Sequence, residues 1–442
     1  MPRRPASGAR AARAGKANAV TGPATAGVLT IQAAARPRRT GRIGIALAGG
    51  GPLGAFYELG ALQALTECIK GFVPCDLYGY AGVSSGSMLA AGLANGLTPV
   101  DIGRITISND AGLDTAHPGL FLRPAFAEYA RRLALLPGIA LRALAQFARA
   151  PLSQGVAEAL APLAAAMPAG FLDSAPFERY LRRLYGSGGR TNDFRKLSRR
   201  LFIVATNLNT GEAALFGQPG LDHVPISRAV QASTALPGLY SPVEIEGETY
   251  ADGALLRTMH ASVLLEAGVD LLFAINPLVP FDASADHDGA REIELTRLGL
   301  PVVLGQTFRA LIRSRMQVGV ASYKDRFPRA EIVLLEPDRG DRRMFFANVF
   351  RYSDRRELVD HAFDCTRREL LRRATELSPL LARHGLALDR DSLDDPARSF
   401  QAALERQRQQ DRRVAENLGA TLDRLDRALS RAGGAVSRMG VR

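Results

Sequence analysis

The short motif Gly-Val-Ser-Ser-Gly at residues 82–86 contains the residue types needed for nucleophilic chemistry. An apolar run at 76–81 precedes it and predicts a buried strand, and a run rich in small residues at 87–94 predicts a helix after it. A strand, G-x-S-x-G and a helix together are typical of a nucleophile elbow, a strained turn that exposes the serine hydroxyl. The motif therefore predicts Ser84 as a nucleophile, with a tight glycine turn in an α/β sheet as the alternative.

A glycine-rich segment upstream could stabilise the charge that acyl transfer creates. Gly49, Gly50 and Gly51 follow a predicted strand at 42–48, and glycine amides can approach a substrate oxygen because no Cβ intervenes. The amide of Ser85 is a further candidate, since a helix N-terminus carries unpaired N–H groups and the positive end of the helix dipole. A nucleotide phosphate is the alternative ligand, but the spacing matches neither G-x-G-x-x-G nor the P-loop pattern.

The residues alone leave the general base open. None of the six histidines follows a predicted strand in a context that marks a catalytic residue; they are His117, His223, His260, His287, His361 and His384. Asp252 directly follows a predicted strand, where a carboxylate can point into a cleft. A carboxylate is a weak base unless burial raises its pKa. A Ser-Asp dyad, a Ser-His-Asp triad and a plain Asp-Gly turn therefore all remain possible.

Composition and charge bound the class of protein. With 442 residues and 47% hydrophobic residues, the chain can bury a sizeable core in one large domain or in two to three smaller ones. The net charge is +12, but residues 1–40 carry seven Arg, one Lys and no acid, which leaves only +4 for the rest. No nucleic-acid-binding motif accompanies this charge, so we predict a disordered basic tail and no nucleic-acid partner.

The chain contains neither a long apolar run nor a cysteine framework. No stretch approaches 18 apolar residues, and residues 17–35 are a poor secretory signal because Thr-Gly-Pro interrupts them. Three cysteines favour a reducing compartment, and we therefore expect a cytoplasmic protein that can bind a membrane peripherally. Cys68 and Cys75 lack metal-ligand spacing and are predicted as core residues, so no metal site is expected.

Beyond the two glycine motifs, strands and helices alternate in the way typical of a parallel α/β sheet. We expect residues 49–54 to form a loop. Further strands are predicted at 201–206, 213–216, 271–275 and 331–335, and a hairpin at 244–250. Helices are predicted at 55–70, 226–234, 258–267, 354–375 and 376–385.

Two helical segments interrupt or follow this alternation. Residues 101–195 are rich in Ala, Leu and Arg, and the helix at 139–149 is amphipathic with a basic polar face. It is either packed on the domain or part of a lid or membrane contact. A second amphipathic helix, at 395–432, carries the apolar stripe Val414, Leu418, Leu422, Leu425 and Leu429. This stripe predicts either self-association through residues 411–430 or packing against the body of the protein.

Several motifs in order resemble the patatin-like phospholipase family. They are the glycine loop, G-x-S-x-G, the segment Ala-Val-Gln-Ala-Ser-Thr-Ala-Leu-Pro-Gly at 229–238, and Asp-Gly-Ala at 252–254. The resemblance implies a three-layer α/β/α sandwich with a mainly parallel central sheet. It also implies Ser84 as nucleophile, Asp252 as general base without a catalytic histidine, and Gly50 and Gly51 amides as oxyanion donors. The implied reaction is hydrolysis of lipid acyl esters through an acyl-serine, with no cofactor.

The resemblance covers about residues 42–280 and extends to the strand at 331–335. We therefore expect a catalytic domain over 41–340 that includes the helical insertion 101–195, a helical extension over 341–394, and a C-terminal helix and tail over 395–442. Leu53 departs from the family pattern, which has Arg or Lys there. Phospholipids, neutral glycerolipids, short esters and a polyester thus remain candidate substrates. A catalytically inactive scaffold is the alternative function, and Arg257 is a candidate replacement cation.

Overall fold

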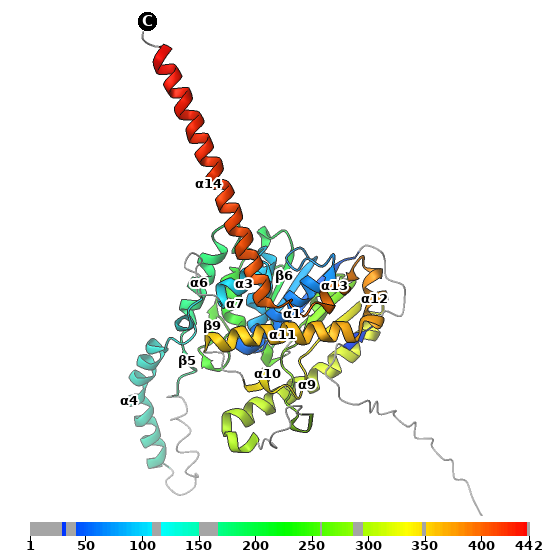
Figure 1. The fold of residues 1–442 in the computed structure, drawn as a ribbon. Coiled ribbons are helices and arrows are strands. Elements are labelled where there is room, and N and C mark those ends of the chain that lie inside the picture. Colours follow the sequence, from blue (N-terminus) through cyan, green and yellow to red (C-terminus); the bar gives the residue numbers. More distant parts are fainter. Residues whose placement is uncertain are drawn as a thin grey trace, which may run out of the picture.

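The computed structural model describes residues 29–31, 41–107, 116–149, 167–256, 259–285, 295–346 and 351–439. Its centre is a mixed sheet in which β12, β11, β2, β4 and β6 run parallel in that order (Figure 1). Antiparallel strands flank this parallel part: β1 pairs with β12, and β7 and β10 pair with β6, while β9 pairs with β10. The strands are β1 Leu29–Ile31, β2 Ile43–Leu47, β4 Gly79–Val83, β6 Arg200–Asn207, β7 Ala213–Phe216, β9 Val243–Ile245, β10 Glu248–Asp252, β11 Leu271–Ile275 and β12 Glu331–Leu335.

Helices cover both faces of the sheet, and the alternation of side chains along β11 shows why. Phe273 and its neighbours at 271 and 275 share a core with α1 (Gly51–Cys68), α2 (Ser85–Ala94) and α11 (Tyr352–Arg372). Leu272 and Ala274 point the other way, into a second core with α8 (Ala261–Glu266) and α9 (Leu300–Arg326). The predicted three-layer α/β/α sandwich is therefore confirmed.

The glycine loop is shorter than predicted. Helix α1 begins at Gly51, so residues 51–54 form its first turn and not a loop. Pro52 suits this turn because its fixed φ is helical and its missing N–H would have had no partner there. Gly54 is needed because a Cβ would lie 2.9 Å from Cγ of Pro277. The N-terminus of α1 consequently lies at the end of β2, next to the serine motif.

Part of the predicted N-terminal tail is ordered. Residues 29–31 form β1, which pairs antiparallel with β12, so the prediction of disorder over 1–40 is wrong for this segment. These three residues pair with backbone groups of β12 that would otherwise lie at the sheet edge. The other residues of the tail lie outside the described residues.

The helical insertion contains α3 (Pro99–Thr106), α4 (Phe126–Arg149) and α6 (Ala175–Tyr185). Helix α4 extends away from the body of the protein (Figure 1). At its base, β5 (Gly170–Leu172) pairs with β8 (Gly238–Tyr240). The side chains of α4 from residue 143 onward, and Arg257, lie outside the described residues. In the part of the chain that the structure describes, no helix has the length and apolar character needed to cross a membrane.

The C-terminal helices extend the first core and then leave it. Helix α11 packs along α1 so closely that a Cβ at Gly60 would lie 2.4 Å from the Val359 carbonyl oxygen. Phe400 and Leu404, at the start of α14, are buried, and the helix then projects from the body (Figure 1). The remaining elements are β3 Ile69–Lys70, α7 Ile226–Ser233, α10 Arg342–Phe346, α12 Ala374–Arg383, β13 Ala387–Leu388, α13 Arg390–Asp394 and α14 Phe400–Met439.

The apolar stripe of α14 is exposed. Val414 and Leu429 expose 60% and 62% of their surfaces, and the three leucines between them expose similar fractions. Packing of this stripe against the body, one of the two predictions, is therefore wrong.

Candidate active site

Ser84 lies at the sharp turn between β4 and α2. Its backbone has φ 51° and ψ −126°, a strained conformation for a residue with a side chain. The two flanking glycines make the turn possible: a Cβ at Gly82 would lie 2.5 Å from Cα of Ser87, and a Cβ at Gly86 would lie 2.6 Å from the Ala48 carbonyl oxygen. The backbone has the form of the predicted nucleophile elbow.

Two hydroxyl groups hold this strained turn in place. The amide of Ser84 donates a hydrogen bond of 2.8 Å to Oγ of Ser233, and that hydroxyl donates one of 2.6 Å to the carbonyl oxygen of Val204 on β6. On the other side, Oγ of Ser87 donates to the Ser84 carbonyl oxygen at 2.5 Å. Ser233 ends α7 and belongs to the 229–238 segment, a motif that was recognised without a role for this serine.

Asp252, the last residue of β10, is the partner of Ser84. Its Oδ2 accepts a hydrogen bond of 2.6 Å from Oγ of Ser84, and its Oδ1 accepts one of 2.8 Å from the amide of Ala254. The side chain is buried, and this burial raises the pKa of the Asp252 carboxyl to about 6, although both hydrogen bonds oppose the shift. The carboxylate is thus ionised at neutral pH and is a stronger base than an ordinary aspartate.

The backbone around Asp252 is fixed as well. The Asp252 amide donates to the Ala235 carbonyl oxygen at 2.9 Å, and Oγ1 of Thr206 donates to the Asp252 carbonyl oxygen at 2.9 Å. Gly253 follows because a Cβ there would lie 2.3 Å from the Val204 carbonyl oxygen. The Asp-Gly pair therefore turns the chain sharply at the end of β10 and keeps the carboxylate directed at Ser84.

The candidate oxyanion donors lie beside Ser84. A Cβ at Gly49 would lie 3.0 Å from Cβ of Ser84, so only a glycine fits comfortably there. The amide of Gly50 donates to Oγ of Ser85 at 3.1 Å, which ties the glycine loop to the start of α2. Because α1 begins at Gly51 and α2 at Ser85, the positive ends of two helix dipoles meet at this point.

An apolar cavity of about 340 Å³ opens over the Ser84–Asp252 pair. Its wall is mostly apolar and includes Phe56, Leu59, Met88, Leu89, Phe121, Phe177, Leu236, Leu239, Tyr240, Leu278 and Phe308. One cation, Arg355 of α11, also lines it; the guanidinium stacks over the Phe56 ring at 5.7 Å and donates to the Thr106 carbonyl oxygen at 3.4 Å. Arg355 was not predicted, because nothing in the sequence links α11 to the serine motif.

No histidine among the described residues lines this cavity. His223 pairs with Glu246, His384 with Glu331 and His361 with Asp341, while His287 lies outside the described residues. Leu53, in the first turn of α1, packs against the core, so the position that carries Arg or Lys in the resembling family adds no charge here.

Known proteins are similar to this chain over part of its length. A family model described as patatin-like phospholipase matches residues 45–265, half of the chain. Uncharacterized NTE family proteins of Mycobacterium bovis and Mycobacterium tuberculosis are 34% identical over 73 residues, which is 16% of this chain and 19% of each relative. The match thus spans less than a fifth of those relatives.

Two solved structures are more distantly similar. VipD from Legionella pneumophila is 15% identical with a TM-score of 0.35, and the match covers 79% of this chain and 70% of VipD. The type III effector protein ExoU is 18% identical with a TM-score of 0.31, and the match covers 76% of this chain and 53% of that one.

Proposed function

Because this chain belongs to the patatin-like phospholipase family, we propose that it is a serine acyl hydrolase that cleaves carboxylic esters of lipids through a Ser84–Asp252 dyad. The observation that carries the proposal is the 2.6 Å hydrogen bond from the Ser84 hydroxyl to a buried carboxylate, at the floor of an apolar cavity. Nucleophile, base and acyl-binding surface are thereby brought together in one place.

In the first half of the reaction, Oγ of Ser84 attacks the carbonyl carbon of the ester while its proton passes to Oδ2 of Asp252. The carbonyl oxygen becomes negatively charged and is stabilised by backbone amides of the 49–51 loop and of Ser85, at the N-termini of α1 and α2. The tetrahedral intermediate then collapses, the C–O bond to the leaving alcohol breaks, and the alcohol takes the proton from Asp252. The product left on the enzyme is an acyl-serine ester.

In the second half, Asp252 accepts a proton from a water molecule as the water oxygen attacks the acyl carbon. Asp252 then returns this proton to Oγ of Ser84 as the second intermediate collapses, the bond between Oγ and the acyl carbon breaks, and a fatty acid is released. One carboxylate thus serves as base and then as acid in each half, which requires a pKa close to the working pH. Burial of Asp252 supplies that shift.

The cavity favours a substrate with an apolar chain. Apart from Arg355 and the dyad itself, the surface around Ser84 offers few charges, so an acyl chain would replace water against Phe, Leu and Met side chains. Arg355 could contact a phosphate or glycerol oxygen near the ester and take the role of the basic residue that Leu53 replaces. We therefore propose glycerophospholipids as the substrate class, with neutral glycerolipids as the alternative.

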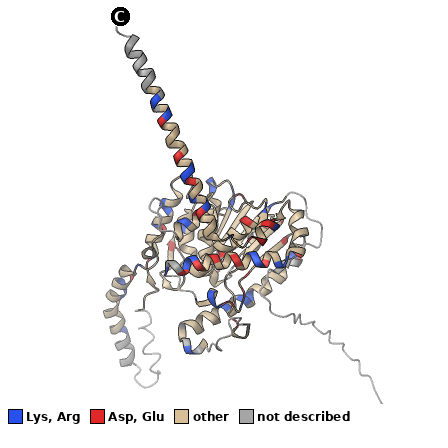
Figure 2. Cartoon of the chain, viewed as in Figure 1, with Lys and Arg blue, Asp and Glu red and all other residues tan. Residues whose placement is uncertain are grey.

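We also propose that the protein acts at a lipid surface that contacts the base of α4. Three exposed apolar side chains lie there: Phe126, Phe171 and Leu239. The Ala125 amide, just before α4, donates to the Phe171 carbonyl oxygen of β5, and β5 pairs with β8. β8 carries Leu239, which also lines the catalytic cavity. Along α4, Leu133 and Leu141 expose 63% and 69% of their surfaces, and no charged residue lies between these two leucines (Figure 2). An acyl chain could pass from the lipid into the cavity at this rim.

Vesicle binding tests the lipid surface. Leu133→Ser combined with Leu141→Ser should weaken binding to vesicles of anionic phospholipid about tenfold or more, since each change removes an apolar side chain from the contact. Val318→Ser is the matched control, because Val318 of α9 is 71% exposed and lies on another helix. Equal binding by the double variant and the control would contradict the proposed contact.

The activity itself is tested by release of fatty acid from phospholipid vesicles, a neutral glyceride and a p-nitrophenyl ester. Ser84→Ala and Asp252→Asn should each lower kcat/KM by at least about a thousandfold on every substrate that wild type cleaves. A fluorophosphonate probe should label wild type at Ser84 and fail to label Ser84→Ala. Ser187→Ala, at a solvent-exposed serine, is the control and should keep full activity and labelling.

Two outcomes would contradict the proposal. Wild type that is inert on all three substrates and unlabelled by the probe would indicate a catalytically inactive scaffold. Activity that survives Asp252→Asn but is lost when one histidine is replaced would indicate a Ser-His-Asp mechanism instead.

A further inference from the structure

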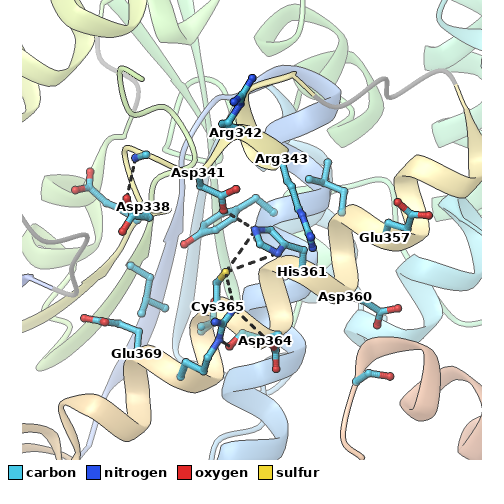
Figure 3. A pocket seen from close by; sticks show the side chains of 18 of the residues that line it. Asp338, Asp341, Arg342, Arg343, Glu357, Asp360, His361, Asp364, Cys365 and Glu369 are labelled. Atoms are coloured by element: carbon cyan, nitrogen blue, oxygen red, sulfur yellow. Dashed lines mark hydrogen bonds and ion pairs between the residues drawn. The ribbon is translucent and has the colours of Figure 1, made fainter. Parts of the chain in front are cut away.

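A second and larger cavity lies away from the catalytic serine. It has a volume of about 1350 Å³ and shares no lining residue with the cavity over Ser84. Its wall comes from the segment 335–346 after β12, from α11, from Tyr57 of α1 and from residues 396–399 (Figure 3). Nothing in the proposed acyl chemistry uses these residues.

Three side chains of different donor types meet on the wall of this cavity. His361 and Cys365 are four residues apart on α11 and therefore share one helix face, and Asp341 comes directly before α10 (Figure 3). Nε2 of His361 lies 2.5 Å from Oδ2 of Asp341 and 3.5 Å from Sγ of Cys365. One donor atom from each residue lies within 4.8 Å of the other two.

This arrangement does not suit a Cys-His-Asp catalytic triad. In a triad, the nucleophile and the acid occupy opposite nitrogens of the imidazole, so that the ring can accept a proton at one side while the acid orients it from the other. Here the carboxylate and the thiol both approach Nε2, and Sγ is farther from Nδ1, at 4.0 Å. Three donors that converge on one point are instead the arrangement of a metal site.

We propose that Asp341, His361 and Cys365 bind a divalent transition-metal ion of the zinc type, with water from the cavity as the fourth ligand. A sulfur, a nitrogen and an oxygen donor together favour Zn²⁺ over Mg²⁺ or Ca²⁺, which prefer oxygen ligands alone. Three protein ligands and a water are typical of open zinc sites, and the cavity gives the ion a path from solvent.

One of the measured distances fits this metal, and a second would have to lengthen. Two ligands bound at about 2.0–2.3 Å to one tetrahedral zinc ion lie about 3.3–3.8 Å apart. The separation of 3.5 Å between Sγ and Nε2 falls in this interval. Oδ2 of Asp341 and Nε2 of His361 lie 2.5 Å apart, and a metal bound between them would require these two atoms to move about 1 Å further apart.

The charges around the cluster also suit a cation. Eight carboxylates and five arginines are among the described residues that line the cavity. One of these arginines, Arg368, has a guanidinium nitrogen 3.6 Å from Sγ of Cys365. Arg368 is itself paired with Asp364 at 3.4 Å, so it does not repel the incoming ion at full strength.

The experiment uses the full-length protein after treatment with a chelator, titrated with Zn²⁺ and, separately, with Co²⁺ as a spectroscopic probe. We expect about one equivalent of Zn²⁺ to bind and to raise Tm, because the ion binds only the folded chain. Co²⁺ should produce a sulfur-to-metal charge-transfer band. Cys365→Ser should abolish this band, and Cys365→Ser and His361→Gln should each raise the Kd for Zn²⁺ at least about a hundredfold.

Matched controls are available in the same chain. Cys75→Ser removes the other partly exposed cysteine, and His223→Gln removes a histidine that is also paired with a carboxylate; both should bind Zn²⁺ like wild type. In wild type, Zn²⁺ should slow alkylation of Cys365 by N-ethylmaleimide at least tenfold and leave Cys75 unchanged, a readout that does not depend on the folding of any variant.

Three results would overturn the proposal. The first is binding of less than about a tenth of an equivalent of Zn²⁺ when Zn²⁺ is present at micromolar concentration. The second is Mg²⁺ binding as tight as Zn²⁺ binding. The third is a charge-transfer band that persists in Cys365→Ser. None of these measurements uses acyl hydrolase activity, so the metal site and the proposed function can fail independently.

Discussion

The Ser84 hydroxyl donates a hydrogen bond of 2.6 Å to Oδ2 of Asp252, although 168 residues separate the two along the chain. The contact exists because β4 and β10 both pair with β6 along the same edge, one after the other, while β7 occupies the opposite edge. β4 runs parallel and β10 antiparallel to β6, and the register places Val83 opposite Val204 and Asp252 opposite Ala205. One strand thus sets the position of both members of the dyad.

The pKa of Asp252 sets the pH dependence of the reaction. The general base must be ionised, and burial raises its pKa to about 6, so kcat/KM should fall below pH 6 and level off above pH 7. At pH 5 about a tenth of the plateau value should remain, whereas an aspartate of ordinary pKa would retain nearly all of it. A profile measured on a soluble ester, with circular dichroism to confirm folding at pH 5, checks this. A flat profile between pH 5 and 7 would refute it.

Ser233 should act on catalysis through the backbone of Ser84. Ser233→Ala leaves the buried Ser84 amide and the Val204 carbonyl oxygen without their hydroxyl partner, so the unfolding free energy should fall by about 2 kcal/mol. Relaxation of the strained turn should also lower kcat at least tenfold. Urea unfolding and steady-state kinetics measure the two effects.

Ser227→Ala is the control for Ser233, because Ser227 is a buried serine on the same helix whose hydroxyl bonds Glu178 and Asn192 instead. It should lose stability and keep kcat. A similar loss of kcat in both variants would mean that Ser233 acts only through stability.

Arg355 should distinguish phospholipids from neutral glycerolipids. Arg355→Met keeps an apolar stem over the Phe56 ring and removes the only described cation that lines the catalytic cavity. We expect kcat/KM on phospholipid to fall about tenfold, as for one lost charge-assisted contact, with little change on a neutral glyceride. Arg326→Met, at an exposed arginine paired with Glu266, is the control. Equal losses on both substrates would contradict a headgroup contact.

The exposed stripe of α14 should join two copies of the chain. Leu418, Leu422, Leu425 and Leu429 follow a spacing of four, three and four residues, which is the pattern of a coiled-coil seam. Sedimentation equilibrium should give a dimer for wild type and a monomer for Leu422→Glu with Leu425→Glu. Glu416→Lys, a charge change elsewhere on the same helix, should remain dimeric. A monomeric wild type at tens of micromolar would exclude this dimer.

The sequence by itself determined the local features of this protein. The glycines at 82 and 86 specify the serine turn, because only they avoid collisions with backbone within and beside the turn. The alternation of apolar strands and helices specified a three-layer sandwich, because a parallel sheet must be covered on both faces. Even Asp252 was found as a candidate, since a carboxylate after a strand followed by glycine is a local pattern.

Only the tertiary structure decided which of these residues meet. From the sequence, either a histidine or Asp252 could be the general base of Ser84. The register of β4, β6 and β10 places the Asp252 carboxylate against Ser84. Arg355 reaches the catalytic cavity because α11 packs along α1. Asp341 lies next to His361 and Cys365 because the segment after β12 returns beside α11. Turn and helix signals arise from short-range sterics that a sequence displays directly. Contacts between distant segments depend on how whole helices and strands pack against one another, and the spacing of residues along the chain does not reveal this packing.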